Sequence, residues 1–542
     1  MSRFIRGNVT ARPHPAWRCA AWLASVALGG MAGEAVAHGF GQRYDLPLPL
    51  LLFIGTGGVM VAASFALIAA FATRLRHERE YPRFDLRRTG VGRALSHPLA
   101  VGLVRLLGVI AFLVLLVAGF FGVQNPFRNI VPTAIWVIGW IGLAYVCALA
   151  GDAWALLNPF RTLYRWCELA WTRLTGGKQL SLGWPLPQWL DVWPAVVLLL
   201  AFSWAEIVWS GNEVPANIAA VLLGYAILTF AGMHVFGREP WLARGEVFSL
   251  VFGLFARFSP TEVRVRSSVC CNACDQLACR LQPGDCVQCH ACMARAEPGQ
   301  WEWNLRPFGA GLLCRSPVVS SMAVLVCVAL ATVTFDGVRE TPFWERIMFW
   351  AFHPLQPTPG PKAELVLTAG LVLTAGVFLA AYTGCCTLVA ALVTAGMRRA
   401  GNPSAAAPRA WTLARLFVLS LLPIAIAYHL AHYLHYLLVA GQFIIPLVSD
   451  PLGLGWDLFG TAGYRTNPGL VGARFSWYAA LVAIVSGHMI AMYVAHVTSL
   501  RHFRDGRLAL LSQYPLAVLM VAYTMLSLWI LAQPVVEQVP LG

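Results

Sequence analysis

"PLAVGLVRLLGVIAFLVLLVAGFF", residues 98–121, contains a single charged side chain, Arg105. A helix of about 20 apolar residues is long enough to cross the hydrocarbon core of a bilayer. Comparable stretches recur from Leu50 almost to the C-terminus, and we therefore predict an all-α polytopic transmembrane bundle of roughly ten spans. The predicted spans lie near residues 50–72, 98–121, 131–150, 193–210, 216–236, 317–335, 364–395, 412–440, 476–499 and 514–533.

The composition indicates the same class. Of 542 residues, 58% are hydrophobic and 12% are charged, and 21 are Trp, which is typical of a multi-pass membrane protein. The net charge of +14 comes largely from basic loops that recur after every second span. Basic loops stay on the cytoplasmic side of a membrane, so we expect a bacterial inner-membrane protein with its mature N-terminus in the periplasm. The expected partner of this charge is anionic lipid rather than nucleic acid. The basic loops are residues 74–88, 158–173, 236–250, 397–415 and 501–507.

The N-terminus has the pattern of a signal peptide over residues 1–37. Four arginines precede a short apolar run from Cys19 to Met31, and small residues follow at 35–37. Cleavage there would make His38 the first residue. An uncleaved anchor is the alternative, although the run is short for a span. The rest divides into a transmembrane block (38–258), a polar module (259–303) and a second block (304–542) with a histidine-rich helix pair.

The polar module contains "VCCNACDQLACRLQPGDCVQCHACMARA", residues 269–296. Cysteine thiolates two residues apart can bind one metal ion, so these spacings predict a cytoplasmic structural zinc site, with an iron–sulfur cluster as the alternative. "CVQCH" also matches the attachment pattern of c-type haem, but the expected cytoplasmic location argues against that cofactor. Disulfides are expected only if the topology is inverted. The candidate ligands are Cys271, Cys274, Cys279, Cys286, Cys289 and Cys292, beside Cys270.

A second group of candidate ligands lies inside a predicted span. "AYHLAHYLHYLLVAGQ", residues 427–442, places His429, His432 and His435 three residues apart, on neighbouring positions of one helix face. His429 should lie about a dozen residues, or roughly 18 Å, below the outer surface. His488 on the next span is at a similar depth, and His496 is two turns deeper. Ionisable groups within a membrane usually face the bundle interior or a cavity.

These histidines predict a metal site, because neutral imidazole binds zinc, copper and iron. Single interhelical hydrogen bonds are the ordinary alternative. Haem on facing helices, or copper bound with His38 and His353, are further possibilities. Three carboxylates are candidates for catalytic roles, namely Asp450, Asp457 and Glu206. The first two lie in a Pro/Gly-rich outer loop and Glu206 lies near the outer end of its span, so ordinary solvated or snorkelling side chains are the alternative.

Four segments carry a resemblance to a known family: residues 37–53, "AHGFGQRYDLPLPLLLF"; residues 236–260; "RPFGAGLL" at 306–313; and residues 435–460. They are similar to the polytopic bacterial membrane proteins named after fenitrothion hydrolase, and the similarity extends from the signal peptide to the ninth span. The resemblance implies a membrane-bound enzyme that hydrolyses organophosphate triesters and releases a nitrophenol. It supplies no catalytic motif for individual residues.

Together these inferences predict that His429, His432 and His488, with Asp457, hold a divalent metal that activates water for attack on an apolar triester. Zinc is the first choice of metal. A haem- or copper-binding redox or transport protein is the alternative function. A third is a non-catalytic membrane subunit that requires a partner subunit.

Overall fold

The computed structural model describes residues 38–39, 42–43, 50–71, 81–272, 280–282, 285–297, 299–313, 316–352, 361–400, 408–503 and 505–533. The predicted signal peptide, Cys274, Cys279 and His353 lie outside these residues. His38 lies in β1 (His38–Gly39), which pairs with β2 (Gln42–Arg43).

Eight described helical stretches are long and apolar enough to cross a membrane, and they coincide with eight of the predicted spans. The other two predicted spans correspond to α2 and α9, for which shorter apolar stretches are described. The prediction of an all-α polytopic bundle is confirmed. The elements that correspond to the ten predicted spans are α2 (Leu50–Phe71), α4 (Pro98–Phe121), the continuous α5, η3 and α6 (Ile130–Pro132, Thr133–Gly142, Leu143–Leu149), α9 (Trp193–Ile207), α10 (Pro215–Phe236), α15 (Ser320–Arg339), α17 (Pro361–Arg399), α19 (Leu422–Ala440), α21 (Ala473–His502) and α22 (Gly506–Leu531).

Shorter helices connect these elements. Proline and glycine mark the ends of some long helices. Pro215 is the first residue of α10, and Gly237 follows its last residue with a φ of 91°, which favours glycine. The short helices are η2 (Leu86–Arg88), α3 (Gly90–Leu95), α7 (Trp154–Leu157), α8 (Pro159–Leu174), α11 (Arg238–Arg244), α12 (Val247–Phe258), α13 (Ser268–Asn272), α14 (His290–Arg295), η5 (Ala310–Leu312), α16 (Pro342–Phe352), α18 (Ala410–Phe417), η6 (Val418–Leu421), η7 (Gly441–Phe443), α20 (Ile444–Ser449) and η8 (Pro468–Leu470).

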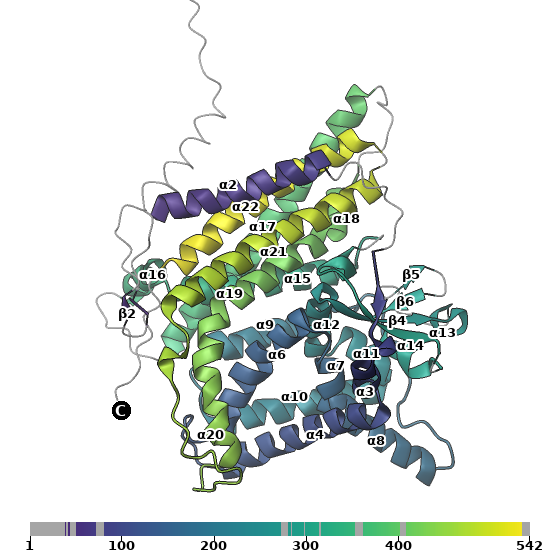
Figure 1. Ribbon diagram of the computed structural model, residues 1–542, viewed down its shortest axis with the longest axis vertical. Coiled ribbons are helices and arrows are strands. Elements are labelled where there is room, and N and C mark those ends of the chain that lie inside the picture. Colours follow the sequence, from purple (N-terminus) through teal and green to yellow (C-terminus); the bar gives the residue numbers. More distant parts are fainter. Residues whose placement is uncertain are drawn as a thin grey trace, which may run out of the picture.

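The two hydrophobic blocks pack as one bundle. Figure 1 shows α4, α6, α9 and α10 on one side of the molecule and α2, α17, α21 and α22 on the other, with α15 and α19 between them. One continuous core of buried side chains crosses this boundary, and it includes Leu199 of α9, Phe252 of α12, Phe417 of α18 and Met520 of α22. The division at residues 259–303 therefore separates stretches of sequence and does not separate folding units.

The segment after α10 corrects a prediction. Residues 236–250 were expected to form a loop at the membrane surface, but α11 folds back along α10. Trp241 packs on Gly232, where a Cβ atom would lie 2.2 Å from the indole ring. Further along, the fully buried Glu246 hydrogen-bonds to Tyr225, in the middle of α10, and caps α12 through the amide of Ser249. Burial of the apolar faces of α11 and α12 favours this arrangement. Glu246 can be buried there because its carboxylate accepts hydrogen bonds from Tyr225 and from the amide of Ser249.

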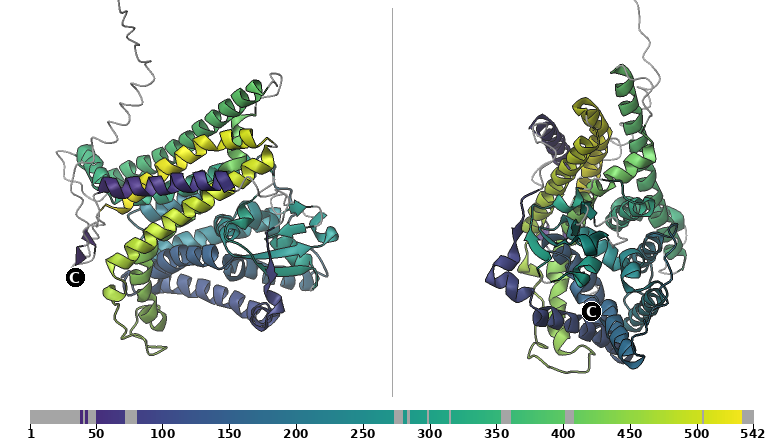
Figure 2. Two further views of the ribbon diagram at one scale, coloured as in Figure 1. Left: turned by 45° about the horizontal axis from the view of Figure 1, so that its top comes forward. Right: turned by 90° about the vertical axis from the view of Figure 1, so that its right-hand side faces the viewer.

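A five-stranded antiparallel sheet lies at one end of the bundle, which we call the sheet end (Figures 1 and 2). Its strand order is β3 (Phe84–Asp85), β7 (Trp301–Leu305), β4 (Thr261–Arg266), β6 (Asp285–Val287) and β5 (Arg280–Gln282). Thr261 pairs with Leu305 and Arg264 pairs with Val287, so β4 is central. The edge strand β3 comes from the loop after the first span, a contribution that the sequence did not reveal.

A buried ion pair joins this sheet to the bundle. The side chains of Arg306 and Glu262 are both fully buried, with Nη1 2.7 Å from Oε2. Arg306 also donates to the carbonyls of Ala256 and Arg257 at 3.0 and 2.9 Å. These carbonyls end α12, where helices leave acceptors unsatisfied. Burial raises the pKa of Tyr81, and Glu262 raises it further, so the Tyr81 hydroxyl stays protonated and donates to Glu262 at 2.7 Å.

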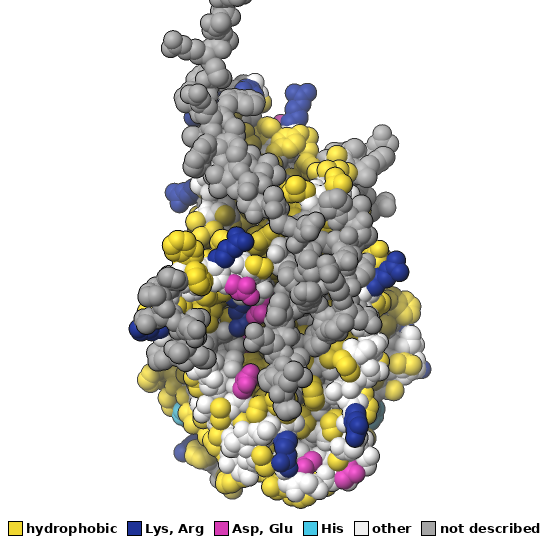
Figure 3. Space-filling model, turned by 90° about the vertical axis from the view of Figure 1, so that its left-hand side faces the viewer, with side chains coloured by type: hydrophobic (Ala, Val, Ile, Leu, Met, Phe, Trp, Pro, Cys, Tyr) yellow, Lys and Arg dark blue, Asp and Glu magenta, His cyan; other side chains and the backbone are white. Residues whose placement is uncertain are grey.

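The opposite end of the bundle has a different surface. Figure 3 shows basic and acidic side chains scattered between hydrophobic ones on the side remote from the sheet. At the sheet end, basic residues occupy the last turns of α8, α12, α17 and α21, with Arg173, Arg257, Arg398 and Arg501 among them. Four helices thus end in basic side chains at the sheet end.

Candidate functional site

A small cavity lies between α9, α12, α15 and α19. The space open to the centre of a water-sized sphere is about 20 Å³, which is enough for a water molecule. The π-helical η3 brings Trp140 to its wall, and α9 contributes Ser203 and Glu206. Longer π-helical segments are rare and often accompany functional sites. Polar side chains from three helices thus meet at one place, with Thr332, His429 and Tyr433 completing the polar lining.

His429 points from α19 into this cavity. Its side chain is almost completely buried, and the rings of Trp140, Phe255 and Tyr433 surround it at centroid distances of 5.7, 5.9 and 4.7 Å. The Nε2 atom of His429 has no hydrogen-bond partner among the described residues. A buried polar atom without a protein partner usually bonds to water or to a ligand. The cavity supplies the space for such a molecule.

A network of charged and polar groups adjoins the cavity. Asp336 of α15 accepts hydrogen bonds at one carboxylate oxygen from His432 Nε2 at 3.1 Å and from the Tyr433 hydroxyl at 2.5 Å. Its other oxygen lies 2.9 Å from Arg339 Nε. Because Tyr433 also lines the cavity, this network continues the polar surface of Glu206 and His429. The structure therefore gives His432 a carboxylate partner within the bundle.

The remaining predicted histidines lie elsewhere on α19 and α21. His435 Nδ1 lies 3.1 Å from Ser476 Oγ, and His496 Nδ1 lies 2.7 Å from Gln513 Oε1. His488 donates from Nδ1 to the Ile484 carbonyl at 2.8 Å, while its ring lies 6.0 Å from Tyr523 of α22. The Nε2 atom of His488 has no hydrogen-bond partner among the described residues. His435 and His496 therefore bond to neighbouring helices, whereas the hydrogen bond of His488 lies within α21.

His429 and His488 share a depth but face different helices. α19 and α21 cross closely at Gly487, where an added Cβ would lie 2.2 Å from the Cβ of Ala427. His488 therefore lies within about a turn of the level of His429, as the spacing predicted. However, His429 faces Trp140 and Phe255, whereas His488 faces Tyr523. The structure does not bring His429, His432 and His488 into one ligand set.

The two loop carboxylates stabilise their own loop. Asp450 accepts hydrogen bonds from the amides of Leu454 and Gly455 at 2.9 and 2.7 Å, and Asp457 accepts one from Ala462 at 2.9 Å. The same loop packs on the end of α4, where the Val123 amide donates to Leu452. Among the three predicted carboxylates, Glu206 alone lines the cavity.

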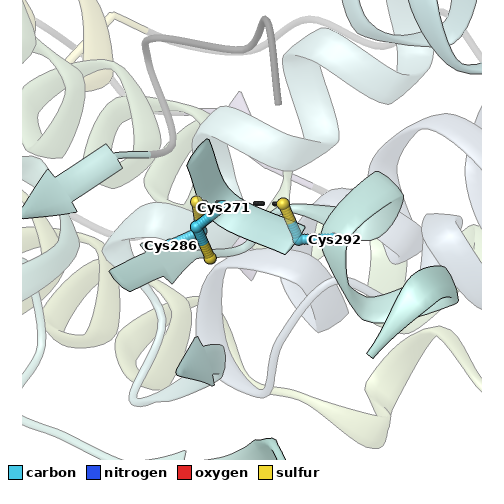
Figure 4. A group of neighbouring side chains, drawn as sticks. All are labelled: Cys271, Cys286 and Cys292. Atoms are coloured by element: carbon cyan, nitrogen blue, oxygen red, sulfur yellow. Dashed lines mark hydrogen bonds between the residues drawn. The ribbon is translucent and has the colours of Figure 1, made fainter. Parts of the chain in front are cut away.

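A second candidate site lies in the sheet. Cys271 of α13, Cys286 of β6 and Cys292 of α14 are buried, and their Sγ atoms lie within 4.8 Å of one another (Figure 4). Of the residues that the structure describes, these form the one group of three or more His, Cys, Asp or Glu side chains with this geometry. Cys289 is buried in the same cluster. The described cysteines are not disulfide-bonded.

The surroundings of Cys286 favour its neutral thiol. Burial raises the pKa of Cys286, and the neighbouring Cys271 raises it further. A metal ion binds thiolates, so binding here would release protons.

The sequence missed two polar groups of the bundle. Asp336 is a carboxylate within an otherwise apolar stretch, "AVLVCVALATVTFDG" at 323–337, and a scan for ionisable residues in long apolar windows would have found it. Glu246 lies in a segment whose charges resemble a surface loop, so no local pattern could have found it. Comparisons with protein families, with characterised proteins and with solved structures found no match to this chain.

Proposed function

We propose that this chain is a membrane hydrolase of apolar organophosphate triesters, in which Glu206 and His429 activate the attacking water. One observation supports the site most strongly: the buried His429 Nε2 has no partner among the described residues and lies at a water-sized cavity that Glu206 also lines. The reaction class comes from the resemblance described above. The site differs from the predicted metal centre, because the histidine nitrogens do not form a ligand set.

In this proposal the water oxygen attacks phosphorus while His429 Nε2 takes one proton of the water. The new P–O bond replaces the bond to the aryl oxygen, which leaves as a nitrophenolate. Glu206 accepts the second hydrogen bond of the water and stabilises the protonated imidazole. General base catalysis of this kind contributes about 10²–10⁴ to the rate.

The substrate would enter from the lipid. A dialkyl aryl triester is uncharged and partitions into bilayers, and the cavity lies among apolar and aromatic side chains. The cavity volume of about 20 Å³ accommodates water, so the proposal requires the helices around it to separate for the triester. We further propose that the sheet end is cytoplasmic in an inner membrane, with support from the basic residues that end α8, α12, α17 and α21 at that end.

The test is nitrophenol release by proteoliposomes that contain the purified chain. We expect activity in the wild type and a loss of about 100-fold or more in His429→Gln and Glu206→Gln. His435→Gln is the matched control, because this imidazole lies on the same helix and bonds to Ser476. Full activity in either cavity variant would refute the assigned site. No release by correctly inserted wild-type protein would refute the hydrolase.

A second candidate function is proton transfer across part of the membrane. The small volume of the cavity favours it, since the polar groups from Glu206 through Tyr433 and Asp336 to His432 could pass protons without admitting an organic substrate. Proteoliposomes with an internal pH dye distinguish the two functions. Proton flux that depends on Asp336 and Glu206, without nitrophenol release, would favour transport.

A further inference from the structure

The core of the sheet is composed mainly of cysteines. Its buried cluster consists of one valine, Val265, and four cysteines, and Trp301 and Met293 pack around it. So few aliphatic side chains bury little apolar surface, and small modules of this kind commonly need a disulfide or a metal for stability. The described cysteines carry no disulfide. A bound metal would supply the missing stabilisation.

The positions of the thiols fit a single ion. The Sγ atoms of Cys286 and Cys292 are 3.8 Å apart. With zinc–sulfur bonds of about 2.3 Å, two ligands at tetrahedral corners lie roughly 3.8 Å apart. The Cys271 Sγ atom lies within 4.8 Å of both. In a four-iron cluster each thiolate binds a different iron, which would spread three sulfurs more widely than this.

The backbone between two of the cysteines is held in an uncommon conformation. Gln288 lies between Cys286 and Cys289 and has a φ of 54°, which non-glycine residues seldom adopt. Two hydrogen bonds fix this turn: the Gln288 amide donates to Val263, and its side-chain amide donates to Ala256 of α12, each at 2.7 Å. Conformations of this kind persist where surrounding contacts impose them, often at ligand sites. Here the turn directs Cys286 and Cys289 into the same buried cluster.

We propose that Cys271, Cys286 and Cys292, together with Cys289, bind one divalent metal ion of the zinc class at the sheet end. Four thiolates complete the closed tetrahedral shell of a structural zinc site. The three closest ligands come from a helix, a strand and a second helix, so the ion links elements that share little other core. The site is independent of the reaction at the membrane cavity.

The experiment measures metal on the full-length chain purified in detergent. Elemental analysis should find one zinc per chain in the wild type and in Cys270→Ser, the matched control, because Cys270 is only partly buried at the edge of the cluster whereas Cys289 is buried within it. Cys286→Ser and Cys292→Ser should each weaken zinc binding by at least about 100-fold. Loss of a residue that only hydrogen-bonds to a metal ligand already weakens binding by about 10–100-fold, and loss of the ligand itself should weaken it more. Cys289→Ser tests the fourth ligand in the same way.

A second measurement covers the case in which a cysteine variant does not fold. Wild-type protein is stripped with a chelator and titrated with Co²⁺, which should give the sulfur-to-cobalt charge-transfer absorption of a tetrahedral thiolate site, and zinc should displace it. Absence of both zinc and the cobalt absorption would refute the proposal. Iron with stoichiometric acid-labile sulfide, or disulfides among these cysteines, would also refute it.

Discussion

The cysteine cluster and the histidine-bearing helices were both predicted as ligand sets, but their geometries differ. The thiols of Cys271, Cys286 and Cys292 lie within 4.8 Å of one another, whereas His429 and His488 point toward different helices. The three thiols come from three short elements, α13, β6 and α14, which pack around one small cluster. The histidines lie on long straight helices, and there depth alone does not determine which neighbour a side chain meets.

The reason is geometrical. The rise of 1.5 Å per residue fixes depth from the sequence number alone. The direction of a side chain depends in addition on the rotation of each helix about its own axis, and packing sets that rotation. The close crossing at Gly487 sets it for α19 and α21. Two sites with equally suggestive spacings can therefore differ in whether their residues converge.

The largest expected loss of stability comes from breaking the ion pair that joins the cysteine-containing sheet to the helical bundle. Arg306→Met removes one partner of a fully buried ion pair and the cap of α12, and should lower the free energy of unfolding by about 3–5 kcal/mol. Thermal unfolding in detergent measures this. Arg266→Met is the control: its side chain is 57% exposed beside Glu302, and a change within about 0.5 kcal/mol is expected. Equal effects of the two substitutions would contradict the role of Arg306.

Removal of the proposed zinc ion should destabilise the cysteine-containing sheet and not the helical bundle. Zinc at about 100 times its Kd stabilises the folded site by about 2.7 kcal/mol. Chelation should therefore accelerate amide exchange in β4 and β6 by up to about 100-fold and leave α15 and α19 unchanged. Hydrogen exchange with mass spectrometry reports both regions in one experiment. Faster exchange throughout the bundle would show that metal binding stabilises the sheet and the bundle together, which would contradict this prediction.

The crossing that orients the histidines can be tested by overpacking. Gly487→Ala places a Cβ 2.2 Å from the Ala427 Cβ and 2.7 Å from the Pro423 carbonyl, and should cost about 1–3 kcal/mol. Gly384→Ala on α17 is the control, because no atom lies within 4 Å of its added Cβ, and alanine favours a helix. Denaturant unfolding of both variants provides the comparison. If Gly487→Ala left the free energy of unfolding unchanged, α19 and α21 would cross less closely than described.

The smallest effect distinguishes two neighbouring tyrosines. The Tyr523 hydroxyl lies 2.7 Å from Thr334 Oγ1, so Tyr523→Phe should cost about 1 kcal/mol. The buried Tyr428 hydroxyl has no hydrogen-bond partner among the described residues, and its removal should cost nothing or stabilise the bundle. The melting temperatures of the two variants measure the difference. The reverse order would contradict the assigned hydrogen bond.

Several features of the site could be predicted from sequence. Glu206 and His429 were both predicted as site residues, and both line the cavity. Their residue types in apolar spans were the signal, because a buried ionisable group needs a polar neighbour or a cavity. Asp450 and Asp457 were predicted with equal weight, yet they accept hydrogen bonds from their own loop. A residue that follows a helix closely in the sequence need not point back toward that helix, because the path of a long loop depends on its own contacts.

By itself, the sequence determined that the chain forms an apolar helical bundle with a small cysteine-rich module, because span length and hydrophobicity are local properties. It also determined that His429 and His488 lie at a similar level, through the fixed rise of the helix. Only the tertiary structure decided that α11 and α12 fold back along α10, that β3 completes the sheet, and which helix each histidine faces. These features depend on contacts between residues far apart in the chain, and side-chain packing rather than local pattern selects them.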